Sequence, residues 1–145
     1  MAQAIAYLGF NGNCAEAVRF YERVLGLGAE IQKLVSAGDI PMADQIPKEH
    51  RHRIIHARLR FSDGSYLFAG DAPAQAPYEG IKSVSIAMNY PTVAEAERVF
   101  KALAEGGKVS MPQQATMWAK SSGMVTDRFG TPWIINGELL GEYAL

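Results

Sequence analysis

The strongest constraint on the fold is a partial internal repeat. Similar residues recur at an offset of 79 positions. Those of the first half are Ala15-Glu16-Ala17, Phe20-Tyr21 and Gly28, and they match Ala94-Glu95-Ala96, Val99-Phe100 and Gly107 of the second. Residues 63–67 resemble residues 129–133 at an offset of 66. Because the offset falls from 79 to 66 along the chain, the first copy is expected to contain about 13 extra residues, between Ser36 and Arg53. The chain is therefore predicted to contain two copies of one supersecondary unit.

Each copy is predicted to fold as a strand, a helix and three further strands. Apolar runs at residues 5–10 and 84–90 open the copies as strands. Two capping-box pairs, Asn13 with Glu16 and Thr92 with Glu95, mark the helix starts, and paired glycines mark the helix ends. The remaining strands are expected at residues 29–35, 54–61, 66–70, 108–111, 118–126 and 132–136. The expected fold class is α+β, with two βαβββ modules.

We predict that residues 1–145 form a single domain built from these modules. Its parts are a first module at residues 4–71, a linker at 72–80, a second module at 81–137 and a C-terminal tail at 138–145. The stretch between Ser36 and Arg53 contains Gly38 and two prolines, and is predicted to be a loop. A loop of this length in a compact domain is usually functional or mobile.

Composition narrows the classes of partner. A net charge of -1 provides no global basic field, so we expect neither nucleic acid nor a membrane surface as a partner. No stretch approaches the roughly 20 apolar residues that span a bilayer. The single cysteine, Cys14, excludes an intrachain disulfide, and the first 20 residues do not resemble a secretory signal. These features favour a cytoplasmic protein.

Several motifs together resemble one family. They are residues 7–14, His56-Ala57, Phe68-Ala69-Gly70-Asp71, Met117-Trp118-Ala119 and residues 125–136. As a set they resemble PhnB-like proteins of the vicinal oxygen chelate superfamily, which has the glyoxalase and bleomycin-resistance fold. The resemblance implies paired modules whose sheets curl around a cavity, and commonly a homodimer. It does not imply one reaction, because the superfamily includes isomerases, epimerases, ring-cleaving dioxygenases, antibiotic-modifying enzymes and drug-sequestering proteins.

The resemblance also implies where a divalent ion would be held. Carried over through the repeat offsets, the superfamily's ligand positions fall at or near Ala6, Phe68, Ser85 and Ile134. Three of these side chains have no donor atom, and a lone hydroxyl is a poor ligand for a divalent ion. We therefore expect no metal at this site. We also expect no nucleotide-like cofactor, because the chain lacks a glycine-rich strand-to-helix loop.

The strand expected at residues 54–61 supplies the most interesting candidate. Its apolar alternation is formed by Ile55, Ala57, Leu59 and Phe61. The two-residue period of a strand then sends His56, Arg58 and Arg60 to the opposite face. If that face lines the cavity, His56 is a candidate catalytic residue and Arg58 a candidate ligand contact. In the alternative, the arginines lie on the solvated rim and His56 forms hydrogen bonds only within the sheet.

Four other residues are candidate ligand contacts. Phe68 and Ser85 are expected to face the cavity with His56. Trp118 is a candidate cavity wall, whereas Trp133 fits a wall or the core beneath a helix equally well. Asp71 could fix the His56 tautomer, although turn chemistry favours a role in the turn that follows.

Residues with reactive side chains outside this group are given structural roles. Asp127 is interpreted as a turn residue that bonds its own backbone. Cys14 is interpreted as a buried thiol, because no general base is identifiable beside it. His50 and His52 have a spacing that can bind metal, but a solvated loop or lid is the favoured interpretation.

Two classes of function remain open from the sequence. The first is a metal-independent protein that binds an unidentified small molecule, either with or without turnover. A drug-sequestering resistance protein would be the form without turnover. The second is a metal-dependent lyase, isomerase or dioxygenase of the glyoxalase type, which needs ligands that the sequence does not place.

Overall fold

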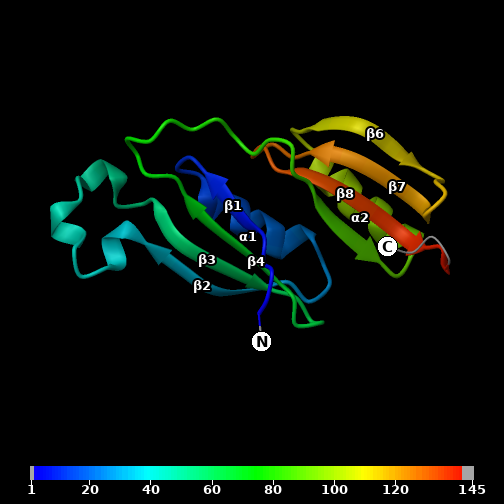
Figure 1. Ribbon diagram of the computed structural model, residues 1–145, viewed down its shortest axis with the longest axis horizontal. Helices are drawn as coiled ribbons and strands as arrows, with labels where there is room; N and C mark the ends of the chain where they lie inside the picture. Colours follow the sequence, from blue (N-terminus) through cyan, green and yellow to red (C-terminus); the bar gives the residue numbers. More distant parts are fainter. Residues whose placement is uncertain (1, 142–145) are drawn as a thin grey trace. The chain divides into compact units, whose positions relative to one another are not determined.

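The structure is a computed structural model that describes residues 2–141. The chain divides into two compact units, Met1–Gly80 and Ile81–Leu145. Each unit has the predicted order of one strand, one helix and three strands, so the α+β class with two βαβββ modules is confirmed (Figure 1). Within residues 2–141, no helix is long and apolar enough to cross a membrane.

The first unit is a four-stranded mixed sheet covered on one face by a helix. The strand order is β1-β4-β3-β2, with β1 and β4 parallel and the other pairs antiparallel. The bounds are β1 (Tyr7–Phe10), α1 (Cys14–Val24), β2 (Glu30–Ser36), β3 (Ile54–Arg60) and β4 (Tyr66–Asp71). The core lies between α1 and the sheet, where Phe10, Leu59 and Tyr21 are almost fully buried.

The second unit repeats this arrangement with the order β5-β8-β7-β6. Its bounds are β5 (Ile86–Tyr90), α2 (Val93–Ala104), β6 (Lys108–Gln114), β7 (Ala119–Thr126) and β8 (Pro132–Leu139). Trp133 and Ile135 of β8 pack beneath α2 with Val99 and Leu103. Strand β8 runs to Leu139, three residues beyond the expected Asn136, and residues 142–145 of the predicted tail lie outside the described residues.

The sheet register corrects the alignment of the two copies at their first strands. Tyr7 lies opposite Phe68 in the first unit, and Ala87 lies opposite Ile134 in the second. Tyr7 and Ala87 are 80 positions apart, not 79. The extra residue lies in the turn between β1 and α1. Ser85 therefore precedes β5 and is exposed, and Ala87 takes the place beside Ile134.

The two helices begin differently. The predicted cap of α2 is confirmed, because the Thr92 hydroxyl accepts a hydrogen bond from the Glu95 amide at 3.2 Å. The predicted capping box at Asn13 is wrong, because the Asn13 side chain forms no capping hydrogen bond. Instead, Oδ1 of Asp71 accepts hydrogen bonds from two amides at the start of α1, those of Gly12 and Cys14.

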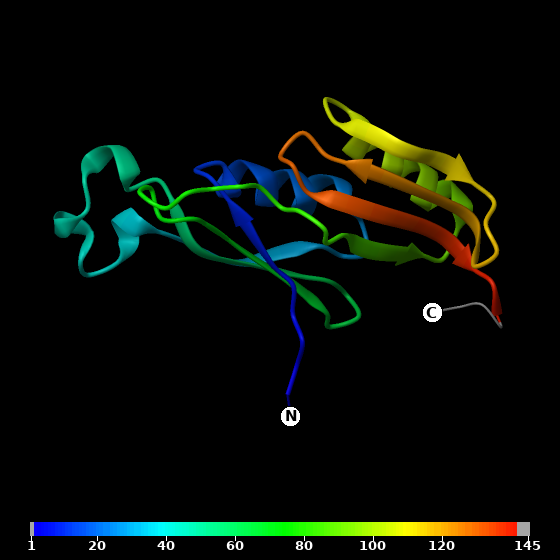
Figure 2. The same cartoon turned by 45° about the horizontal axis from the view of Figure 1, so that its top comes forward.

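The extra residues of the first copy form the predicted loop between β2 and β3. The segment contains three short 3-10 turns, η1 (Ala37–Asp39), η2 (Ala43–Gln45) and η3 (Lys48–His50). Figure 2 shows it projecting from the ends of β2 and β3. Two backbone hydrogen bonds close its base, from the Ala37 amide to the Arg53 carbonyl and from the Gly38 amide to the Arg51 carbonyl.

Candidate functional site

The first sheet has one face against α1 and one face free of it. Ala57 and Leu59 of β3 are buried on the helix side, whereas His56 and Arg58 alternate to the other side. The predicted separation of His56 and Arg58 from the apolar residues is confirmed. Arg60 is exposed at the end of the strand, where the solvated-rim interpretation places it.

The predicted position of Ile55 is wrong because β3 contains a bulge. Val35 lies opposite His56, and the next residue, Ser36, lies opposite Ile54, so Ile55 is an extra residue on β3. The bulge interrupts the two-residue alternation. Ile54 is consequently buried at 4% exposure, while Ile55 is 46% exposed.

Side chains from three strands meet on the face opposite α1. We call this the open face and define it by Tyr7, His56, Arg58, Tyr66 and Phe68. The Phe68 ring lies 4.9 Å from the His56 ring and 6.2 Å from the Tyr7 ring, between ring centres. The Arg58 guanidinium carbon lies 5.1 Å from the centre of the Phe68 ring, within cation–π range. The open face thus combines aromatic surface with the Arg58 guanidinium and the His56 imidazole.

Tyr7 connects His56 to the backbone of β3. Its hydroxyl lies 3.1 Å from the Ile55 carbonyl oxygen and 3.1 Å from Nδ1 of His56. Burial lowers the pKa of His56, and the positive charges of Arg58 and Lys33 lower it further. The lowered pKa favours the neutral form of the imidazole.

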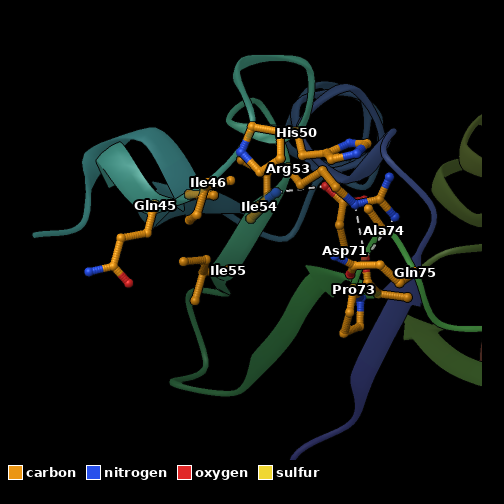
Figure 3. Close-up of a pocket in the computed structure, with 13 residues that line it drawn as sticks. Gln45, Ile46, His50, Arg53, Ile54, Ile55, Asp71, Pro73, Ala74 and Gln75 are labelled. Atoms are coloured by element: carbon orange, nitrogen blue, oxygen red, sulfur yellow. Dashed lines mark hydrogen bonds between the residues drawn. The ribbon is translucent and has the colours of Figure 1, made fainter. Parts of the chain in front are cut away.

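A pocket of about 420 Å³ lies between the 36–53 loop and the chain that leaves β4. Figure 3 shows its apolar lining, which includes Ile46, Ile54, Ile55 and Pro73. Its polar lining includes His50. We call it the loop pocket. One lining residue, Ile55, directly precedes His56 in β3.

Asp71 has a role that neither predicted alternative described. Its Oδ1 accepts hydrogen bonds from the amides of Gly12 and Cys14, at 2.7 and 3.1 Å. Its Oδ2 accepts a hydrogen bond from the amide of Ile54 at 2.7 Å. The carboxylate thus joins the start of α1 to the start of β3. Sequence reasoning missed this because the partners are 17 to 59 positions away.

The interpretation of Cys14 as a buried thiol is confirmed. The residue is fully buried in the first turn of α1. Burial raises the pKa of the Cys14 thiol to about 12, and the nearby Asp71 carboxylate contributes to the rise. The thiolate that a nucleophile requires is therefore not formed at neutral pH.

In the second unit, Trp118 belongs to a polar network. Its Nε1 donates a hydrogen bond to Oδ1 of Asn136 at 3.2 Å, and the Ser122 hydroxyl donates to the same oxygen at 2.7 Å. The Asn136 amide nitrogen donates to Oδ1 of Asn89 at 2.9 Å. Sequence analysis missed Asn136, whose signal was a polar side chain within an otherwise apolar strand.

Trp133 lies in the core beneath α2, which is one of the two alternatives left open. It is 1% exposed, and its Nε1 donates a hydrogen bond to Oδ2 of Asp127 at 2.8 Å. Oδ1 of Asp127 accepts hydrogen bonds from the amides of Phe129 and Thr131. The interpretation of Asp127 as a turn residue is therefore confirmed.

The side chains at the superfamily's ligand positions do not fit a divalent ion. With the corrected register, these positions are Tyr7 beside Phe68 in the first sheet and Ala87 beside Ile134 in the second. Together they offer one phenol, whereas divalent ions require several imidazole, thiolate or carboxylate ligands. Across residues 2–141, no group of three or more His, Cys, Asp or Glu side chains is placed to hold a metal ion.

Comparisons with known proteins agree on one family. Residues 5–135 match the model of the Glyoxalase/Bleomycin resistance protein/Dioxygenase superfamily. Protein YjdN of Escherichia coli (strain K12) is 35% identical over 139 residues, which cover 90% of this chain and 91% of YjdN.

Two solved structures have the same fold. The crystal structure of protein PA1353 from Pseudomonas aeruginosa is 46% identical, with a TM-score of 0.85, and the match covers 95% of this chain and 98% of that one. A protein from Bacillus cereus described as a putative 3-demethylubiquinone-9 3-methyltransferase, PhnB protein, is 23% identical, with a TM-score of 0.76. That match covers 93% of this chain and 98% of the Bacillus chain.

Proposed function

Because the chain belongs to the glyoxalase/bleomycin resistance protein/dioxygenase superfamily, we propose that it binds a small molecule on the open face of its first sheet. The observation that carries the proposal is the cluster of Phe68, His56 and Arg58 opposite α1. The side chains at the superfamily's metal-ligand positions offer a single phenol, which supports binding of the small molecule without the superfamily's divalent ion.

The charge of Arg58 is not neutralised by a carboxylate. Within the described residues, its guanidinium forms no ion pair, and its Nε is buried without a hydrogen-bond partner. The group is instead held over the Phe68 ring. A cation that the protein places against an aromatic ring without a carboxylate partner can attract a negatively charged or oxygen-bearing ligand.

The surroundings favour a planar molecule with an apolar part. Phe68 and Tyr7 provide aromatic surface, and the loop pocket adds apolar side chains next to Ile55. Small-molecule sites commonly combine such walls with a few polar groups that orient the ligand. The proposed ligand is thus an aromatic or conjugated compound with at least one polar oxygen.

The three other residues predicted to contact the ligand lie outside the open face. Trp118 lies in the second unit beside Asn136, and Ser85 is an exposed residue before β5. The Asp71 carboxylate is engaged by backbone amides. Contact of these three side chains with a ligand stays a prediction. We also propose a homodimer, from the resemblance, and a cytoplasmic location, from the single buried thiol.

Replacing Phe68 by alanine is expected to weaken binding of aromatic probes about tenfold. The change removes both the ring surface and the cation–π partner of Arg58, which together contribute on the order of 1–2 kcal/mol. The probes are 4-nitrophenol and its methyl ether, 4-nitroanisole, titrated into EDTA-treated full-length protein. Calorimetry or thermal melting provides the readout, because a ligand at about 100 times its dissociation constant adds roughly 2.7 kcal/mol of stability.

Phe129→Ala is the matched control for this variant. Phe129 also lies under an arginine, with the Arg128 guanidinium carbon 4.9 Å from its ring centre, but it belongs to the second unit. We expect its removal to leave probe affinity unchanged. Equal losses in the two variants, or none in Phe68→Ala, would contradict the proposed site. Conversion of a bound compound into product would identify an enzyme, and stoichiometric binding without product a sequestering protein.

A further inference from the structure

We propose that His56 accepts a proton through Nε2, so that the open face binds compounds with a weakly acidic planar hydroxyl group, a phenol or an enol, as their anions. This inference rests on the proposed function, since it specifies the ligand class of the same face. Hydrogen bonding determines how protons are distributed between Tyr7 and His56.

The Tyr7 hydroxyl has one proton and two neighbours. It lies 3.1 Å from the Ile55 carbonyl oxygen and 3.1 Å from Nδ1 of His56. A carbonyl oxygen can only accept, so the phenol proton must be donated to Ile55 if that hydrogen bond is to form. The contact with His56 is then a hydrogen bond only if Nδ1 carries the proton. In a neutral imidazole this leaves Nε2 as the acceptor.

The other tautomer of His56, with Nδ1 unprotonated, leaves one of these two contacts without a hydrogen bond. If the Tyr7 hydroxyl donated its proton to Nδ1, the hydroxyl oxygen would face the Ile55 carbonyl oxygen at 3.1 Å without a proton between them. Two oxygen atoms in such a contact repel each other. The tautomer with a proton on Nδ1 is the one in which both contacts are hydrogen bonds.

The electrostatic surroundings of the free protein favour the neutral form of His56. The groups facing it are Lys33 from β2, Arg58 from β3, the Tyr7 phenol from β1 and the uncharged Phe68 ring from β4. Two of these are cations. Burial lowers the pKa of His56, and these two positive charges lower it further, so the imidazole of the free protein is held in its neutral form. A bound anion beside the imidazole opposes these cations and favours the imidazolium, so His56 takes up a proton only together with the negative charge of the ligand.

The proton transfer is balanced within the proposed complex. The O–H bond of the ligand breaks, and the proton binds to Nε2 of His56 to form imidazolium. The electron pair stays on the ligand oxygen, whose negative charge is compensated by Arg58 and by the imidazolium. No oxidant or reductant takes part. An ether of the same shape has no proton to give, so it binds the aromatic surface without this ionic contribution.

The test compares 4-nitrophenol with 4-nitroanisole. The phenolate form of 4-nitrophenol absorbs visible light, so its ionisation on the protein can be read at a pH at which the free probe is mostly protonated. Wild-type protein is expected to increase the phenolate absorption and to bind the phenol at least about tenfold more tightly than the ether, the effect of one charge-assisted contact. His56→Gln should bring the ratio of the two affinities close to one and abolish the absorption increase.

Tyr7→Phe tests the role of the hydroxyl as a positioning group. The variant keeps the ring but frees Nδ1 of its partner, and we expect a smaller phenolate increase than in wild-type protein. A second measurement does not depend on binding. Nitrogen-15 chemical shifts should show a protonated Nδ1 and an unprotonated Nε2 for His56, with the resonances assigned by their loss in His56→Gln.

The outcomes separate this inference from the proposed function. Binding of both probes with equal affinity and no phenolate increase would overturn the proton transfer and leave the binding site intact. A proton on Nε2 in the nitrogen-15 spectrum would also overturn it. Failure of both probes to bind would overturn the proposed site and the inference with it. Phe129→Ala serves again as the control that should behave like wild-type protein.

Discussion

Replacing Asp71 by alanine is expected to lower the free energy of unfolding by about 3 kcal/mol. Three backbone amides, those of Gly12, Cys14 and Ile54, donate hydrogen bonds to this carboxylate. Loss of the acceptor leaves amides unpaired at the starts of both α1 and β3, and each unpaired buried group costs about 1–3 kcal/mol. Because Asp71 is only half-buried, water can satisfy part of the hydrogen bonding that these amides lose. The expected loss of stability is therefore near the lower end of the range summed over the three amides. Urea unfolding of the full chain measures the loss.

Two variants of comparable charge change serve as controls. Asp71→Asn keeps one acceptor oxygen, so it should lose less stability than Asp71→Ala. Asp44→Ala removes an exposed carboxylate of the 36–53 loop and should change the free energy of unfolding by no more than about 0.5 kcal/mol. If Asp71→Ala were as stable as Asp44→Ala but bound the probes more weakly, Asp71 would be a ligand contact and not a structural acceptor.

Replacing Asp127 by alanine is expected to lower the free energy of unfolding by about 3–4 kcal/mol. The side chain is 3% exposed and accepts hydrogen bonds from the Phe129 and Thr131 amides. It also accepts one from the Trp133 indole at 2.8 Å. Without this acceptor the indole N–H is left unpaired in the core of the second unit, in addition to the unpaired turn amides. Urea unfolding again provides the measurement.

The Trp133 contribution can be isolated with a double-mutant cycle. Trp133→Phe removes the indole N–H, so in the Asp127→Ala background the second substitution should cost less than it does alone. Asp63→Ala is the matched control in the first unit, because Asp63 bonds the amide and hydroxyl of Ser65 in an exposed turn. A loss below about 1 kcal/mol is expected there. A similarly small loss in Asp127→Ala would show that the buried carboxylate is not a stabilising acceptor.

The backbone amides at the start of α1 and at the start of α2 are satisfied by different acceptors. By the offset of 66, Asp71 at the end of β4 corresponds to Gly137 in β8. Asp71 supplies the acceptor for the start of α1, whereas Thr92 caps α2 from within its own turn. A side chain at Gly137 would meet the Cα of Val93 at 2.9 Å. The glycine therefore allows the start of α2 to lie directly against β8.

The sequence was sufficient for the features that depend on local pattern and on repetition. The βαβββ order, the 36–53 loop and the separation of His56 and Arg58 from the buried side of β3 all follow from short-range periodicity and from the two offsets. The polar turn at Asp127 follows from local turn chemistry. These features require no knowledge of which strands are neighbours.

The features that the sequence did not predict depend on contacts between distant residues. The bulge at Ile55 is defined by the pairing of β3 with β2, which periodicity alone cannot show. The contact of Tyr7 with His56 joins residues 49 positions apart, and it exists because β1 and β3 both pair with β4. Asn136 and its partners in the second sheet were missed for the same reason. Sheet order and register therefore determine the details of the candidate site.

The most direct test of ligand binding on the open face is a nitrogen-15 NMR titration of the full chain with 4-nitrophenol. The largest shifts are expected at the backbone amides of Ile55, His56, Arg58 and Phe68, and Phe68→Ala should reduce them at matched probe concentration. Shifts that cluster instead around Trp118 and Asn136 would place the binding site on the second sheet. That result would contradict the assignment of ligand binding to the open face.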